Sequence, residues 1–173
     1  MSTFLKAFAA LALTASISLS DAHADDHELD IAKVGDEAAD SAFGKADSLN
    51  NKLIKGQKTL DEIKAKVAAA ADDATVLQGA ETDLTALATD LKAVPNEIKA
   101  IIDEAKGIKL SGNFMSKAKK TKAVASNVAQ LGKVKNNADA LIDAVGATTS
   151  EVSKSAKAAA EKAAEAAEED TGQ

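Results

Sequence analysis

Few side chains in this sequence could do chemistry, and the group best suited to binding a metal lies near the amino terminus. The chain of 173 residues has two histidines and no cysteine, tyrosine or tryptophan. If residues 1–24 are removed as a leader, the new terminus reads Asp25-Asp26-His27. A free amine, two backbone amides and an imidazole in that order can hold Cu(II) or Ni(II) in a square plane. Acidic termini without any metal are also ordinary. Asp25, Asp26 and His27 are therefore a candidate Cu/Ni site, and we expect no resident cofactor.

The parts that catalysis requires are largely missing. Beyond residue 24 the chain keeps a single histidine, and it has neither arginine nor a glycine-rich phosphate loop. No Glu-x-x-His pair is present, which excludes the usual di-metal carboxylate bundle. Nucleophiles therefore lack a neighbouring base, and carboxylates lack a partner that would shift their pKa toward neutrality. We predict a protein that works by binding or scaffolding and is not an enzyme.

A block of lysines is the most distinctive polar feature. Between positions 105 and 138 there are eight lysines and no acidic residue, although the whole chain has a net charge of −6. One interpretation is pairing within the molecule, with Lys117 and Lys120 facing Glu97, Asp103 and Glu104, and with Lys133 and Lys135 near Asp90. Each exposed pair would contribute only ~0.2–1 kcal/mol, but together the pairs would set the register of neighbouring helices.

The other interpretation is that this block contacts an anionic surface, such as lipid headgroups, lipopolysaccharide or an acidic partner. Four of the lysines lie close together beside a loop, and two bulky apolar residues at the same end could join them or could equally close a helical bundle. Four nearby lysines on one helix spread around its axis, so a salt-sensitive contact is favoured over insertion into a bilayer. Nucleic acid is a poor partner because arginine is absent and no aromatic residues alternate with the lysines. The candidate contact residues are Phe114, Met115, Lys117, Lys119, Lys120, Lys122, Lys133 and Lys135.

Helices must position these residues, since apolar residues recur at alternating spacings of three and four. This spacing places one stripe along a helix and drives packing against partner helices. Two unbroken sets are present. The first is Ala39, Ala42, Ala46, Leu49, Leu53, Gly56, Leu60, Ile63, Val67 and Ala70, and the second is Leu77, Ala80, Leu84, Leu87, Leu91, Val94, Ile98, Ile101, Ala105 and Ile108.

Two arrangements fit these sets, because the gap between Ala70 and Leu77 keeps them in phase. Either one helix of about 80 residues runs from near His27 to Lys109, or Asp73 caps a second helix that returns antiparallel to the first. We favour the break. Pro95 is also expected to begin a new helix or to kink one, since proline is tolerated at a first helical position.

Further along the chain, glycines mark two more breaks. Residues 107–113 contain Gly107 and Gly112 and predict a loop. The following helix should run to Val145, with its apolar stripe on Phe114, Ala118, Thr121, Ala125, Val128 and Leu131, and then on Ala138, Leu141, Ile142 and Val145. Residues 146–150 predict a second break, followed by an Ala-rich helix whose acidic end should fray because it opposes the helix dipole.

The beginning of the chain resembles a secretory leader. A single Lys6 precedes an apolar run from Ala7 to Leu19, and Ala22-His23-Ala24 supplies the small residues that a signal peptidase reads. We predict cleavage after Ala24, a periplasmic or secreted location, and no transmembrane segment in the mature chain. The predicted organisation is a signal peptide (1–24), a helical bundle domain (25–146) and an Ala-rich acidic helical tail that is partly disordered (147–173).

Taken together, these features predict an all-α protein: an elongated antiparallel bundle or coiled coil of three long helices plus an Ala-rich C-terminal helix. Bulky apolar residues are scarce and alanine is abundant, so the core should be narrow. The expected function is that of a structural or interaction protein of the cell envelope, which binds a protein partner or itself. The alternative is a binder of anionic lipid or envelope surfaces through the Lys-rich helix.

Overall fold

The computed structural model of the protein describes residues 29–70 and 73–170, and this part of the chain is all-helical. The predicted leader and the predicted Cu/Ni site at Asp25, Asp26 and His27 lie outside the described residues. The helices are α1 (Glu37–Phe43), α2 (Ala46–Ala70), α3 (Ala74–Leu91), α4 (Val94–Gly107) and α5 (Phe114–Asp170).

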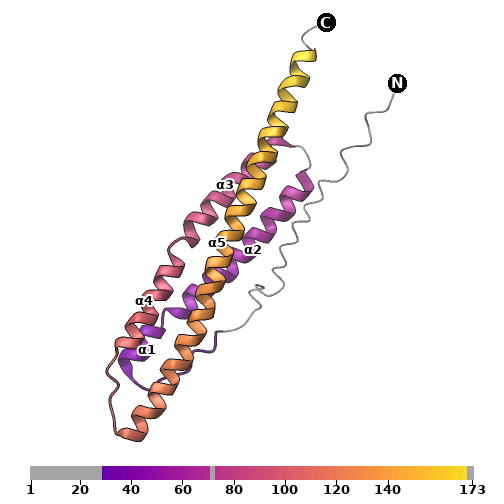
Figure 1. The fold of residues 1–173 in the computed structure, drawn as a ribbon. Helices are drawn as coiled ribbons and strands as arrows, with labels where there is room; N and C mark the ends of the chain where they lie inside the picture. Colours follow the sequence, from indigo (N-terminus) through magenta and orange to yellow (C-terminus); the bar gives the residue numbers. More distant parts are fainter. Residues whose placement is uncertain (1–28, 71–72, 171–173) are drawn as a thin grey trace.

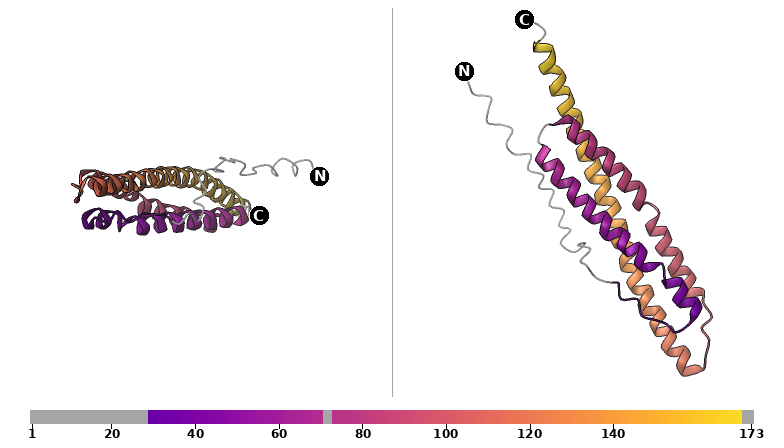
Figure 2. Two further views of the ribbon diagram at one scale, coloured as in Figure 1. Left: turned by 90° about the horizontal axis from the view of Figure 1, so that it is seen from below. Right: turned by 180° about the vertical axis from the view of Figure 1, so that it is seen from behind.

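The helices form an elongated bundle (Figures 1 and 2). α1 and α2 run in one direction, α3 and α4 return, and α5 runs back along both of these segments. α5 has 57 residues and projects beyond its neighbours at both ends, below α1 and α4 at its start and above the end of α2 and the start of α3 at its finish. The long final helix therefore has a free stretch at each end of the molecule.

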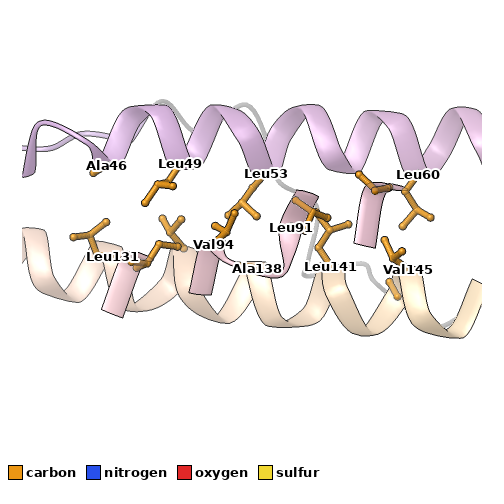
Figure 3. Close-up of a cluster of buried hydrophobic side chains, with 14 of the residues drawn as sticks. Ala46, Leu49, Leu53, Leu60, Leu91, Val94, Leu131, Ala138, Leu141 and Val145 are labelled. Atoms are coloured by element: carbon orange, nitrogen blue, oxygen red, sulfur yellow. The ribbon is translucent and has the colours of Figure 1, made fainter. Parts of the chain in front are cut away.

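Both predicted heptad sets point into the core. In α1 and α2 all members of the first set from Ala39 to Ile63 are buried, and in α3 and α4 the second set is buried from Leu77 to Ala105. Figure 3 shows these side chains meeting those of α5, with Leu91 and Leu141 facing one another between Leu53 and Leu60. Gly56 lies at this contact, where an added Cβ would come within 3.0 Å of Leu91 Cδ2.

The predicted break after Ala70 is confirmed. α3 begins at Ala74, and the Asp73 carboxylate accepts hydrogen bonds from the backbone N–H groups of Thr75 (2.9 Å) and Val76 (3.2 Å). These N–H groups have no partner within the helix, so the cap defines its start. A fresh helix at Pro95 is also confirmed, because α4 begins at Val94 with proline in its first turn.

The predicted break at residues 146–150 is wrong, and so is the separate Ala-rich fourth helix. α5 continues through Gly146, which faces solvent, and the hydroxyls of Thr148 and Thr149 donate to the carbonyls of Ala144 (2.8 Å) and Val145 (2.7 Å). Turn-forming residue types were therefore accommodated within the helix. The stretch beyond them is anchored by the burial of Val152, Ala156 and Ala159, the last two packing with Leu77.

The predicted stripe of α5 is also wrong in its first half. Phe114, Ala118, Thr121 and Ala125 are exposed and Val128 is half-buried, whereas Asn127 is fully buried. The inward positions run through Asn127, Leu131, Val134, Ala138, Leu141 and Val145. An apolar pattern does not identify Asn127, because its side chain is polar. Burial of this amide is tolerated because it has hydrogen-bond partners outside the helix.

α5 is helical to Asp170, and the expected fraying of its acidic end stays a prediction. Its many alanines have the highest intrinsic helix propensity.

Candidate contact surface at the bundle tip

The loop after α4 and the first turns of α5 form one end of the molecule. We call the exposed side chains there the tip surface; they are Lys106, Lys109, Phe114, Met115, Lys117, Lys119 and Lys122. α5 starts sharply because the Asn113 side chain accepts a hydrogen bond from the backbone N–H of Ser116 at 2.9 Å. Gly112 precedes it with φ 114, a conformation that residues with a Cβ rarely adopt.

The two bulky apolar residues of the tip surface lie in solvent. Phe114 is 83% exposed and Met115 is 67% exposed, and the next most exposed large apolar side chain in the described residues is Val76 at 39%. These two side chains therefore do not close the end of the bundle. Large apolar groups gathered at one exposed point are typical of contact sites.

The lysines of the tip surface are not used inside the molecule. Within the described part of the chain, no ion pair involves Lys117, Lys119 or Lys122. No ion pair there links α4 to α5 either. The predicted pairing of Lys117 and Lys120 with Glu97, Asp103 and Glu104 is thus wrong: Asp103 pairs instead with Lys99 on its own helix at 3.3 Å.

Lys120 differs from its neighbours because it points inward. Its ammonium lies 3.4 Å from Asp36 Oδ2, with side chains only 14% and 10% exposed, and it also donates to the carbonyl of Ser111 at 3.1 Å. Lys120 is therefore a structural residue that fastens α5 to the loop and to the segment before α1.

Asp36 is the centre of this arrangement. Its Oδ2 accepts hydrogen bonds from the Ser111 backbone N–H at 3.2 Å and from the Ser111 hydroxyl at 3.0 Å. These two bonds, helped by the charge of Lys120 and opposed by partial burial, lower the pKa of the Asp36 carboxyl below its ordinary value. The carboxylate thus holds three separated parts of the chain beside the tip surface.

A strap of residues 29–36 runs along α5 and is tied to it by amide side chains. Asn127 accepts from the Ala32 N–H at 3.1 Å and donates to the Ala32 carbonyl at 2.8 Å, as a neighbouring strand would. Gln130 donates to the Asp30 carbonyl at 2.7 Å. Sequence reasoning missed this group, although one polar residue at a heptad position of α5 was a usable signal.

The remaining lysines of the predicted contact set lie elsewhere. Lys133 and Lys135 are about three turns further along α5 than Lys122. Lys135 pairs with Asp139 on the same helix at 2.6 Å, not with Asp90 as predicted, and Lys133 is exposed. The structure thus brings together Phe114, Met115, Lys117, Lys119 and Lys122, and it separates Lys120, Lys133 and Lys135 from them.

Within residues 29–70 and 73–170, no three His, Cys, Asp or Glu side chains gather in a way that could hold a metal ion. A shallow depression on α3 is lined by polar side chains that include Thr82, Thr85 and Thr89. Their hydroxyls donate to carbonyls of their own helix at 2.9–3.0 Å. The tip surface is therefore the better candidate for a functional site.

None of the helices in the described part of the chain is long and apolar enough to cross a bilayer. Comparison of the sequence with protein-family models and with curated proteins, and of the fold with solved structures, gave no match.

Proposed function

We propose that this chain is an exported, non-enzymatic contact protein of the cell envelope whose tip surface binds anionic lipid headgroups. Export rests on the leader pattern in residues 1–24. The contact function rests on one observation, namely that Phe114 and Met115 stand in solvent among lysines that have no acidic partner in the described structure.

The physical chemistry of the tip surface suits this role. Each lysine near an anionic membrane contributes about 1 kcal/mol of attraction, which salt weakens. Burying one large apolar side chain adds roughly 1.5–3 kcal/mol. The positive end of the α5 dipole lies at the same point and favours phosphate groups. Two apolar side chains are too few for a helix lying flat in a bilayer, so the molecule would touch the surface with its end.

Co-sedimentation of the purified protein with vesicles tests the proposal. Vesicles of phosphatidylglycerol and phosphatidylcholine should retain the protein at low salt, and pure phosphatidylcholine vesicles should not. The triple substitution K117Q/K119Q/K122Q should weaken retention at least about tenfold, because it removes three surface charges. F114A/M115A should weaken it at low and at high salt alike, because the apolar contribution is not screened.

Matched controls separate the tip surface from net charge. K52Q/K55Q/K58Q removes the same charge from exposed positions of α2 and should bind like the wild type. Val76→Ala removes an exposed apolar side chain far along the chain and should also leave retention unchanged. A second arm with lipopolysaccharide micelles distinguishes a bacterial outer-leaflet source of phosphate from phospholipid. Equal binding of the tip triple variant and the wild type would refute the proposal.

A further inference from the structure

The two projecting ends of α5 carry opposite charge. The first turns hold Lys117, Lys119 and Lys122 and no acidic residue. The last three turns, which we call the acidic overhang (residues 160–170), hold five acidic residues and one lysine. Residues 160–165 of this overhang are exposed, as are the lysines of the tip surface. Glu161 also lies 3.9 Å from Lys157 on the same helix. With five acidic residues and one lysine, residues 160–170 carry a net charge of −4, so one helix has a cationic end and an anionic end.

Both ends oppose the helix dipole. A helix is stabilised by acidic residues in its first turn and by basic residues in its last turn, each contributing typically ~0.3–1 kcal/mol. α5 has no acidic residue in its first turn and no basic residue in its last. The charges at each end of α5 interact unfavourably with its own dipole. They would stabilise each other if the start of one α5 lay beside the end of another.

The apolar side chains at the two ends also match. Phe114 and Met115 stand out from the tip surface, whereas Ala160, Ala163 and Ala164 of the acidic overhang are small and exposed. Small side chains let a neighbouring helix approach closely, so large apolar groups of one copy can cover the helix of the next. The free stretches project in opposite directions, which leaves room for such an overlap (Figure 1).

We propose that copies of this chain associate head to tail, with the tip surface of one molecule bound to the acidic overhang of the next. This inference goes beyond the proposed lipid contact and involves a different element, the acidic overhang. Because this contact joins two different surfaces, copies that point the same way form a chain of molecules whose length rises with concentration. Salt should shorten such chains, because the attraction is between exposed charges.

Charge reversal at each end provides the test, measured by sedimentation velocity without lipid. The tip variant K109E/K117E/K119E/K122E and the overhang variant E161K/E165K/E168K should each remain monomeric where the wild type associates, with association weakened at least about tenfold. Mixing the two variants should restore association, since every tip then meets an overhang of opposite charge. A chain carrying both sets should associate like the wild type.

K117E and E168K lie in the terminal turns of α5 and improve the match with the helix dipole, and the other reversed residues are exposed, so circular dichroism should show unchanged helicity. K52E/K55E/K58E, a reversal on α2, should associate like the wild type. A wild type that stays monomeric at low salt and high concentration would overturn the inference, and so would a mixture of the two variants that stays monomeric. The overhang variant should still bind anionic vesicles, so failure here is distinguishable from failure of the lipid contact.

Discussion

At the scale of single residues, a few polar side chains hold this molecule together where its apolar core is thin. Asp36 collects two hydrogen bonds from Ser111 and an ion pair from Lys120, and Asn127 pairs with both backbone groups of Ala32. Hydrogen bonds to a charged group contribute more than neutral ones, and a buried amide without partners is costly. These contacts fix the strap and the loop against α5, and they determine how the tip surface is presented.

We predict that Asp36→Asn lowers the free energy of unfolding near neutral pH, since a charge-assisted acceptor becomes neutral. The lowered pKa of Asp36 means that its contribution is complete above the ordinary Asp value of about 4 and is lost as the pH falls through the lower, folded-state value. Urea unfolding at neutral and acidic pH should therefore show the gap between wild type and variant closing below about pH 4.

Asp90→Asn, an exposed substitution on α3, serves as the control and should show no such gap. A difference in unfolding free energy between wild type and Asp36→Asn that stays constant down to the lowest pH would show that the ionised carboxylate does not stabilise the fold.

At the scale of helices, prediction from the sequence succeeded where apolar periodicity was strong and failed where a polar residue carried the packing. The heptads of α1 to α4, the Asp73 cap and the start at Pro95 were predictable from residue type and spacing. The continuity of α5 was not, because Gly146 and the threonines after it have turn propensity that tertiary packing overrides. Lys117, Lys119 and Lys122 lie together at one exposed end, but the inward direction of Lys120 depends on Asp36, which is 84 residues away in the chain.

Two glycine-to-alanine substitutions compare an exposed helical position, Gly146, with a position in the packed core, Gly56. Gly146→Ala should stabilise the protein by about 0.5–1 kcal/mol, because Gly146 lies in a helix with nothing near an added Cβ. Gly56→Ala should destabilise it by about 1 kcal/mol net, because its Cβ would press on Leu91 and Leu141 in the core and outweigh the gain in propensity. Thermal and urea unfolding of both variants measure the signs. Destabilisation by Gly146→Ala would indicate that α5 does break there.

At the scale of the whole molecule, the bundle is a rod whose ends differ from its middle. In the middle, α5 packs with α2, α3 and α4, and stretches of α5 project beyond the other helices at both ends (Figure 1). The tip surface and the acidic overhang, for which we propose contacts, therefore lie away from the core. This separation allows the charges of both ends to be changed while the fold is kept, on which the proposed functional tests depend.

Truncation tests that separation. A stop after Ala160 removes residues 161–165, which are exposed, together with the rest of the overhang and the exposed Lys157–Glu161 ion pair, and should change the free energy of unfolding by no more than about 0.5 kcal/mol. A stop after Ala147 removes Val152, Ala156 and Ala159 and uncovers Leu77, so it should cost at least about 3 kcal/mol. Urea unfolding of dilute protein compares the three chains without interference from association. Equal stability of the two truncated chains would mean that the end of α5 does not pack on α3, whereas a large loss from the shorter deletion would give the overhang a structural role. The predicted result, stability kept and head-to-tail association lost after Ala160, would assign the overhang to contact alone.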